Sequence, residues 1–457
     1  MVVKGLPMIS IPRFRFSATP SSSVLTIRAE TVRIMLMAAV AIPLLSISPK
    51  CLAKTPIEDA LEEACQRLAQ ANQNNLTSGQ LLLRERCIAL NSLRNAQGES
   101  AYQAVLKKLS PDQATGQQRT SRNDAHMQMG SVGSRMSLLR TRQNVPGQNL
   151  GMDDHQNESL IGASAGDDDV SRFSGYLNGS TNLASKGATT QEPEYDTDAN
   201  SVTAGVDYRL SPQWVIGAAL GQTRANTDFA QSRGSIDTDG NSVIAYAAFS
   251  IEGLSLDMVL GNTDTSSTTV RNIDYFEDVA MLERVQAKPE SEVDSQNQSI
   301  YLAADYQWQS GAWSYGPSLA VESIKTDVDA YAESQGGGFA IGFAPQSDRL
   351  TRYELGVRLS RAISQSWGVW VPALQVGVNH YQQSTYSPVV ARLLFDELQT
   401  RTFELKSDSI DQDFQRVSLD VSTVIPHGLS AFFSFEQYFG YEDLDISTLT
   451  LGARAEF

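Results

Sequence analysis

The sequence predicts an all-β transmembrane barrel of twelve antiparallel strands, with an α-helix in its lumen and a small helical segment on its N-terminal side. Two observations carry this prediction. From about residue 171 onward, apolar and polar residues alternate in twelve segments of about 9 to 11 residues or more, the length that a tilted strand needs to cross a bilayer. Short and long connections also alternate between these segments, as they do in an antiparallel membrane barrel and have no reason to do in a soluble sandwich.

The expected strands continue to the last residue. We expect them near residues 171–183, 199–210, 213–226, 238–251, 253–268, 296–309, 312–327, 347–363, 366–382, 413–425, 428–440 and 446–457. Short turns are expected at residues 211–212, 252–253, 310–311, 364–366 and 426–427. Long connections are expected at residues 184–198 and 269–295. The barrel domain is therefore predicted over residues 171–457.

Each predicted strand has one apolar face and one face that carries the charges. Val202 and Val206 share a face of the second strand, opposite Asp207. A charge that faces lipid at the bilayer midplane costs about 2 to 4 kcal/mol, so the charged face is assigned to the lumen. The expected lumenal charges are Asp207, Asp257, Asp305, Glu322, Glu354, Asp420, Glu436 and Glu456, with Arg209, Arg358, Arg416 and Arg454. The lumen is therefore predicted to be acidic.

Residues 111–145 are the candidate for a helix inside that lumen. Arginines outnumber acidic residues in this segment, and a helix from residue 117 to 142 would be about 39 Å long, enough to traverse a hydrocarbon core of about 30 Å. We expect Arg135, Arg140 and Arg142 to lie against lumenal carboxylates such as Glu354 and Glu436. The alternative is an exposed or disordered polar segment. Residues 146–170, rich in Gly, Asn and Asp, are expected to be a linker.

Residues 1–53 are expected to be a cleaved signal peptide. Arginines precede the apolar run "IMLMAAVAIPLLSI" at residues 34–47, and the small-x-small sequence "CLA" stands before Lys54. The region before the apolar run is unusually long, so we expect the true start of the protein to lie further downstream. Lipidation of Cys51 is the alternative, but Pro49 and Lys50 occupy positions where a lipoprotein has small residues.

Two cysteines remain after such a cleavage, and both lie in the predicted helical hairpin at residues 54–110. An even pair in an exported chain is most simply a disulfide, so we predict a bond between Cys65 and Cys87. Closing a loop of this size contributes on the order of 3 kcal/mol in the chain-entropy model. Two unpaired buried thiols are the alternative.

Composition argues against two classes of protein. The chain has 52 acidic and 36 basic residues and a net charge of −16, so it repels nucleic acid and offers no basic surface for it. No run approaches the roughly 20 apolar residues of a spanning helix, which excludes a helical membrane protein.

We expect no catalytic, cofactor or metal site. The four histidines, at positions 126, 155, 380 and 427, lack the spacing of a nucleophilic site. His380 in "VNHYQQS" is the candidate for an outer-membrane hydrolase, but the His-x-Ser pattern is absent. "GDDDV" at residues 166–170 lacks the spacing of a calcium loop, and "GGG" at residues 336–338 has no helix after it to cradle a phosphate.

Several segments resemble the autotransporter β-domain, the type V secretion barrel of Gram-negative outer membranes. They are "AGVDYRLSPQWVIGAALG" (204–221), "YGPSLAVESIKTDVDAYAESQ" (315–335), "RYELGVRLSRAISQSWGVWVPALQVGVNHY" (352–381) and the closing "TLGARAEF". The resemblance implies insertion in outer-membrane lipid, export through the periplasm with its chaperones, and a monomeric barrel. It also implies that the barrel-assembly machinery recognises the last strand with its terminal Phe457.

The same resemblance implies self-secretion, in which the barrel translocates or presents its own N-terminal segment. A typical passenger is a long repetitive solenoid or an enzyme, and residues 54–110 are neither. The alternatives are therefore a plugged porin-like channel, a surface adhesin or, third, an outer-membrane hydrolase that uses His380.

Overall fold

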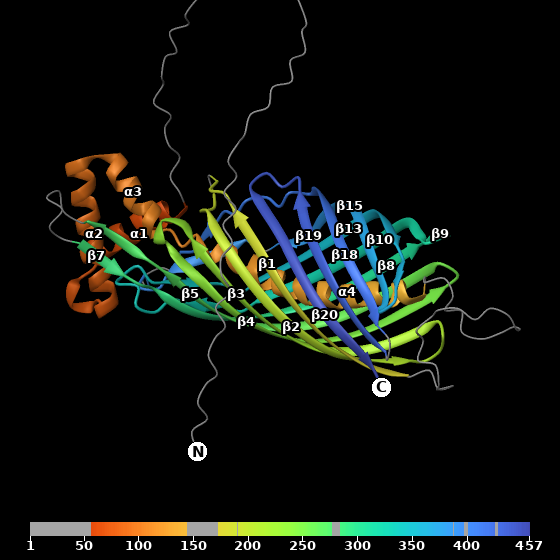
Figure 1. Cartoon of the computed structure of the whole chain (residues 1–457). Coiled ribbons are helices and arrows are strands. Elements are labelled where there is room, and N and C mark those ends of the chain that lie inside the picture. Colours follow the sequence, from red (N-terminus) through yellow and green to blue (C-terminus); the bar gives the residue numbers. More distant parts are fainter. Residues whose placement is uncertain are drawn as a thin grey trace, which may run out of the picture. The chain divides into compact units, whose positions relative to one another are not determined.

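The computed structural model describes residues 56–143, 172–189, 191–276, 284–386, 388–396, 401–425 and 428–457. The predicted signal peptide and linker lie outside these residues. The described chain forms a closed β-barrel, a long helix inside it and a group of shorter helices at one end (Figure 1). No described helix combines the length and the apolar character needed to span a membrane.

The barrel contains twelve long strands among the described residues. Each is antiparallel to its neighbours in sequence order, and β1 pairs with β20 to close the ring. The strands are β1 (Phe173–Lys186), β2 (Tyr195–Arg209), β3 (Trp214–Phe229), β4 (Gly234–Ile251), β5 (Leu254–Arg271), β8 (Glu290–Tyr306), β10 (Trp313–Val328), β13 (Gln346–Arg361), β15 (Gly368–Tyr386), β18 (Asp413–Ile425), β19 (Leu429–Phe439) and β20 (Leu444–Glu456). The predicted number and direction of the strands are confirmed.

The two ends of the barrel differ in their connections. At one end, which we call the short-turn end, the turns are tight, and two of them carry the short strands β9 (Trp308–Ser310) and β14 (Ile363–Gln365). At the other, the long-loop end, the connections contain strands that the sequence analysis did not expect. These are β6 (Ile273–Phe276) with β7 (Arg284–Ala287), and a separate sheet of β11 (Tyr331–Ala332), β12 (Ile341–Phe343), β16 (Val389–Leu393) and β17 (Phe403–Leu405).

The two faces of each barrel strand have opposite character. On β2, Val202 and Val206 are 55% and 57% exposed on the outside of the ring, whereas Thr203 and Asp207 are buried inside it. Four exposed tryptophans lie near the short-turn end, as the aromatic residues of a membrane interface do: Trp214, Trp308, Trp313 and Trp367. The apolar outer surface therefore faces lipid, and the polar face lines the lumen.

Three helices precede the barrel, and we call them the cap module. They are α1 (Pro56–Gln70), α2 (Ser78–Gln97) and α3 (Glu99–Leu109), with a short 3-10 turn, η1 (Gln73–Asn75), between the first two. Thr77 and Gln80 form a capping box that starts α2. Gly98 ends α2 with φ = +85°, a conformation that favours glycine, and α3 follows it directly. The expected two-helix hairpin is therefore part of a three-helix unit.

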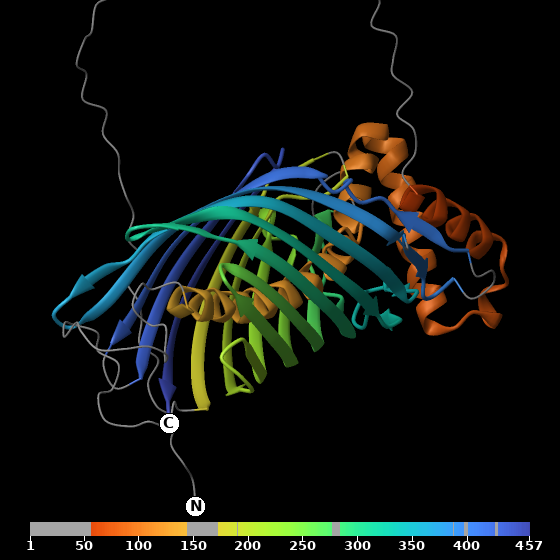
Figure 2. The ribbon, with the colours of Figure 1, turned by 90° about the vertical axis from the view of Figure 1, so that its right-hand side faces the viewer.

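Helix α4 (Gln113–Gln143) follows the cap module and lies inside the barrel (Figure 2). Its 31 residues span about 46 Å. It runs from the long-loop end, where Gln113 bonds the carbonyl of Arg233, toward the short-turn end, where Arg135 meets Asp207. The predicted lumenal helix is confirmed.

Candidate functional site

Helix α4 is predominantly polar and has no continuous apolar face, although Met129, Val132 and Met136 pack in a small apolar cluster with the wall, so its stability depends on the wall around it. Ser121 shares a hydrogen bond of 2.9 Å with Thr265 on β5. About two turns further on, Gln128 donates to Thr223 on β3 (2.9 Å) and accepts from Thr203 on β2 (2.7 Å). Neutral hydrogen bonds of this kind each contribute about 0.5 to 1.5 kcal/mol, so the helix is held by many small contributions.

One ion pair on α4 is fully buried. The guanidinium of Arg135, with no exposed surface, donates from Nε to Oδ2 of Asp207 at 3.0 Å, and Nη2 binds the same oxygen. Ser174 Oγ donates to that oxygen at 2.9 Å, and Tyr246 donates to Oδ1. We call Arg135, Ser174, Asp207 and Tyr246 the anchor cluster. It fixes the end of α4 to the first residues of β1 and the last residues of β2.

The partner of Arg135 differs from the one expected. Glu354 and Glu436 do not bind it; both contact Arg416, at 2.5 Å and 3.3 Å. The cause is the rotation of α4, which turns Arg135 toward the β1–β2 side of the lumen. The side chains of Arg140 and Arg142 lie outside the described residues.

Of the other lumenal positions from the sequence analysis, six are buried: Asp257, Asp305, Glu322, Glu354, Arg358 and Arg454. The remaining five are partly buried: Arg209, Arg416, Asp420, Glu436 and Glu456. Arg358 and Arg454 are each 6% exposed. Arg454 binds Glu456 at 2.5 Å, and its Nε lies 3.8 Å from Asp207. Arg454 therefore brings a second cation close to the anchor cluster.

Phe457 and His380 both lie on the outer surface. Phe457 is 72% exposed, and its backbone N–H donates to the carbonyl of Phe173 (3.2 Å) at the seam that closes the barrel. His380 Nδ1 lies 2.8 Å from Asp413, and half of its side chain is exposed.

No group of three or more His, Cys, Asp or Glu side chains within the described parts of the chain is arranged to hold a metal ion. The acidic run at residues 166–170 falls outside those parts.

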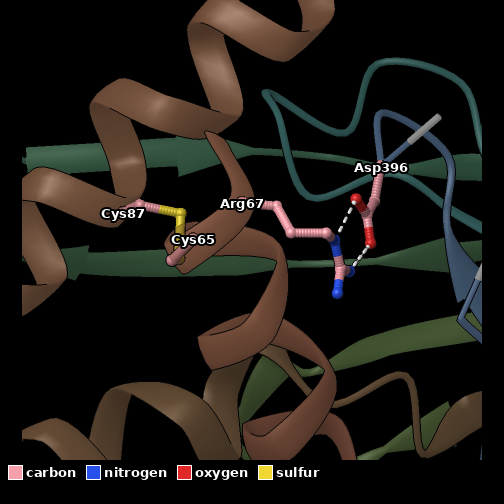
Figure 3. The surroundings of a disulfide bond; sticks show 4 residues. All are labelled: Cys65, Arg67, Cys87 and Asp396. Carbon is pink, nitrogen blue, oxygen red and sulfur yellow. Dashed lines mark hydrogen bonds and ion pairs between the residues drawn. A yellow bond between two sulfur atoms is a disulfide. The ribbon is translucent and has the colours of Figure 1, made fainter. Parts of the chain in front are cut away.

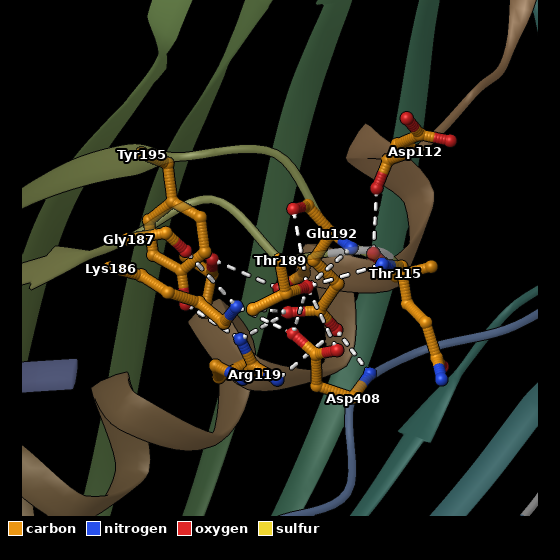
Figure 4. A network of polar contacts seen from close by, with 12 residues as sticks. Asp112, Thr115, Arg119, Lys186, Gly187, Thr189, Glu192, Tyr195 and Asp408 are labelled. Atoms are coloured by element: carbon orange, nitrogen blue, oxygen red, sulfur yellow. Dashed lines mark hydrogen bonds and ion pairs between the residues drawn. The ribbon is translucent and has the colours of Figure 1, made fainter. Parts of the chain in front are cut away.

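A polar network at the long-loop end ties α4 to two connections of the barrel (Figure 4). Arg119 on α4 donates to Glu192 at 2.9 Å. Lys186 bridges Glu192 (3.3 Å) and Asp408 (2.6 Å), and Thr189 donates to Asp408 at 2.8 Å. We call these five residues the mouth network. The sequence analysis missed this network because Glu192 and Asp408 lie in connections between strands. There, the alternation of apolar and polar residues does not predict which way a side chain points.

The cap module shares one apolar core with the long-loop end of the barrel. From the cap module the core takes residues such as Ile57, Leu61, Leu68, Leu83, Leu90 and Leu106, and from the barrel connections Ile273, Tyr275, Phe339, Ile341, Phe343, Val389, Leu393, Phe403 and Leu405. The ring of Phe395 lies so close to Gly79 on α2 that any larger side chain there would collide with it. The module is therefore packed against the barrel connections and is not a free appendage.

Arg271 at the end of β5 joins three parts of this assembly. Its guanidinium is buried and paired with Glu333 through contacts of 2.8 Å and 2.6 Å. It also donates to the carbonyl of Leu109 (2.7 Å), the last residue of α3, and to that of Phe339 (3.0 Å). The unpaired carbonyl at the end of α3 is satisfied by the barrel itself.

A disulfide joins α1 to α2 (Figure 3). Cys65 and Cys87 are bonded, with Cα atoms 5.3 Å apart. Close to them, Arg67 donates from Nε to Asp396 (3.2 Å), which lies in the connection before β18. The bond holds the cap module together, and the neighbouring ion pair holds it to the barrel.

Two exposed ion pairs shift the titration of groups at the long-loop end. The hydrogen bond to Glu99 (2.7 Å) raises the pKa of Arg94 in the cap module. The hydrogen bond from Arg284 lowers the pKa of Asp274 in the β6–β7 hairpin. Both shifts favour the charged forms at neutral pH.

Comparison with known proteins gives the family. Residues 175–436, more than half of the chain, match the family model of the autotransporter β-domain. No curated protein sequence is significantly similar to the chain. Among solved structures, it is similar to the translocator domain of autotransporter NalP from Neisseria meningitidis (TM-score 0.48, 11% identity, 64% of this chain and 90% of that chain).

It is also similar to the β domain of the Bordetella autotransporter BrkA (TM-score 0.46, 17% identity, 63% of this chain and 100% of that one). The transport unit of AIDA-I from Escherichia coli gives a TM-score of 0.41 at 13% identity, over 72% of this chain and 98% of that one. On the strength of the family match, the chain belongs to the autotransporter β-domain family, whose members are transport barrels of the outer membrane.

Proposed function

We propose that this barrel passes its own N-terminal segment through its lumen and keeps the cap module displayed on the cell surface. One observation carries the proposal. Helix α4 connects the cap module at the long-loop end with the start of β1 at the short-turn end, where Arg135 meets Ser174 and Asp207. The chain therefore crosses the whole length of its own barrel before the first strand begins.

The orientation follows from the connections. Outer-membrane barrels have short turns on the periplasmic side and longer loops on the outside. The cap module packs on the long connections, so we place it outside the cell.

The cap module is displayed rather than released. Its apolar side chains share a core with β6, β12, β16 and β17, and Arg271 binds the last carbonyl of α3. Release would expose the apolar residues of both partners to water, at a cost of about 25 cal/mol for each Å². We infer that the mature chain remains a single polypeptide that anchors its own surface domain.

Labelling of intact cells tests the orientation. Ser100 in α3 and Ser310 at the short-turn end are both exposed, so Ser100→Cys and Ser310→Cys form a matched pair. A bulky membrane-impermeant maleimide is expected to label Ser100→Cys in intact cells, and Ser310→Cys only after the outer membrane is permeabilised. Cys65 and Cys87 are bonded to each other and are not expected to react.

The same samples test display against release. The label on Ser100→Cys is expected to stay with the full-length mature chain in the membrane fraction. Label at Ser310→Cys but not at Ser100→Cys in intact cells would reverse the proposed orientation. If labelled cap module appeared in the culture medium, the module would be secreted and not displayed.

We further propose that the terminal Phe457 acts as an assembly signal for the barrel-assembly machinery, after export by residues 1–53 and escort by periplasmic chaperones. In support, Phe457 is exposed beside the seam between β1 and β20. Deletion of Phe457 is expected to lower the amount of heat-modifiable barrel in the outer membrane without affecting export. Phe439→Asp, at an exposed aromatic residue near the long-loop end, is the control and should assemble normally. Equal assembly of the deletion and the parent would contradict this role.

A further inference from the structure

Helix α4 does not fill the lumen evenly. It packs mainly against β3, β4, β5, β8 and β10. On the side of β13, β18 and β19, two cavities lie beside it. The outer cavity, of about 350 Å³, lies toward the long-loop end, and the inner cavity, of about 100 Å³, lies toward the short-turn end.

Small residues on α4 leave room for the inner cavity. Gly130 and Gly133 face open space, since a Cβ atom at either position would meet nothing within 4 Å. Both glycines line the inner cavity, and so does Ser134, the residue after Gly133. The side of α4 that faces the inner cavity therefore carries only small side chains at these positions.

Four residues line both cavities: His126, Glu322, Arg352 and Tyr438. His126 on α4 lies with Nδ1 at 2.9 Å from Glu322 and with Nε2 at 3.3 Å from the hydroxyl of Tyr438. Arg352 binds Glu322 at 3.1 Å. These contacts run from the helix to β10, β13 and β19, so the four side chains form one hydrogen-bonded layer between the cavities. We call it the gate layer.

The lining of the two cavities is rich in carboxylates. Taken together, nine acidic and six basic side chains line them, with His126 in addition. Rings of Asp and Glu side chains favour cations in channels.

We propose that the barrel retains a narrow cation path beside α4, and that the gate layer closes it. This path is separate from the route of the N-terminal segment, which α4 occupies. It would carry small hydrated cations such as K⁺, because the lining is net acidic and the inner cavity, of about 100 Å³, is too small for larger solutes.

Planar bilayers containing the full mature chain test the proposal. His126→Ala removes the helix side of the gate layer while Arg352 still pairs with Glu322. The parent is expected to be nearly closed in KCl, and His126→Ala to raise the single-channel conductance about fivefold or more, with a reversal potential that favours K⁺. Tyr438→Ser opens the layer from β19 and is expected to have the same effect.

Ser121→Ala is the matched control. It lies on the same helix but faces Thr265 on the opposite wall, so the conductance is expected to remain that of the parent. Ser134→Cys combined with His126→Ala locates the path. A cationic methanethiosulfonate reagent is expected to block the current of that double variant, because Ser134 lines the inner cavity.

Three results would overturn the proposal. The first is parental conductance in a heat-modifiable, folded His126→Ala or, should that variant fail to fold, in Tyr438→Ser. The second is a reversal potential that favours Cl⁻. The third is current that the thiol reagent leaves unblocked, which would place the leak outside the lumen.

Discussion

The cap module and helix α4 are neighbours in one stretch of chain, yet different interactions hold them. The cap module is held by a shared apolar core, the Cys65–Cys87 disulfide and the buried Arg271–Glu333 pair. Helix α4 is held mainly by polar contacts. These are hydroxyl and amide hydrogen bonds and ion pairs such as Arg119–Glu192, Arg122–Asp348 and the fully buried Arg135–Asp207. Only a small apolar cluster around Met129, Val132 and Met136 adds to them.

The difference follows from where each part has to be stable. A helix in a polar lumen can exchange its hydrogen bonds with water at little net cost, and its few ion pairs fix its position. The cap module buries apolar surface that finds its partner only on the connections of the long-loop end. Its full stability therefore arises only at that end of the barrel.

Reversal of the charge at Arg135 is expected to have the largest effect. Arg135→Glu places a second carboxylate against buried Asp207, and loss of one partner of a buried pair costs about 3 to 5 kcal/mol. Arg454, 3.8 Å from Asp207, limits the loss. We expect a lower midpoint for urea unfolding and raised conductance in bilayers, because α4 loses its anchor.

The charge-swapped double variant, Arg135→Glu with Asp207→Arg, sharpens this test. It restores opposite charges in the anchor cluster and is expected to regain at least half of the lost stability. No recovery would mean that the geometry of the cluster, and not its charge, holds the helix.

Truncation in the core of the cap module is expected to have the next largest effect. Leu68 is fully buried, and a Leu→Ala change at such a site costs about 2 to 5 kcal/mol. Far-UV circular dichroism should show that the helical signal melts earlier while the heat-modifiability of the barrel is unchanged. Leu81→Ala is the control, because Leu81 is 37% exposed, and should melt almost as the parent does.

Removal of the disulfide is expected to weaken the cap module alone. The combined change of Cys65→Ser and Cys87→Ser frees a loop with a sequence separation of 22 residues. The chain-entropy model gives about 3 kcal/mol for a loop of this size. Limited proteolysis should cut the cap module of this variant sooner, whereas α4 should stay protected. Equal loss of protection in α4 would show that the two parts unfold together.

The smallest effect is expected from the substitution of Asp124, and it is an increase in the stability of α4. Its carboxylate is buried on α4, and neither oxygen has a hydrogen-bond partner among the described residues. Asp124→Asn keeps the shape and cannot ionise, so the cost of burying an unpartnered carboxyl group is lost and we expect the helix to be stabilised by about 1 kcal/mol. Thermal unfolding in detergent measures this change in stability. Asp112→Asn is the opposite control, because it loses the ion pair with Arg233 and should unfold at a lower temperature. A lower unfolding temperature for Asp124→Asn would show that its charge is compensated.

The barrel could be predicted from the sequence because its residue pattern repeats regularly in each strand. Lipid on one side and a polar lumen on the other impose an alternation that each strand repeats, and Val202 and Asp207 fall on the predicted sides. The helix in the lumen was predictable from its length and charge.

The contacts of that helix were not predictable in the same way. Asp207 was identified as lumenal, but its pairing with Arg135 depends on the rotation of α4 and on the stagger of the strands. A count of the charged residues in the sequence determines neither this rotation nor this stagger.

The docking of the cap module left a signal that the sequence analysis did not use. "FAIGF" (339–343) and "VVARLLF" (389–395) are apolar runs within connections, where an exposed loop has no reason to carry them. They form part of the shared core.

The passage of α4 through the barrel also has a mechanical consequence. A force that pulls the cap module away from the barrel acts along α4 and through the covalent chain to β1, which is hydrogen-bonded to β2 and β20 over its whole length. A force in the opposite direction meets three packed helices that cannot enter a lumen already occupied by α4. The cap module is thus tethered with the mechanical strength of the barrel, whatever the strength of its own docking contacts.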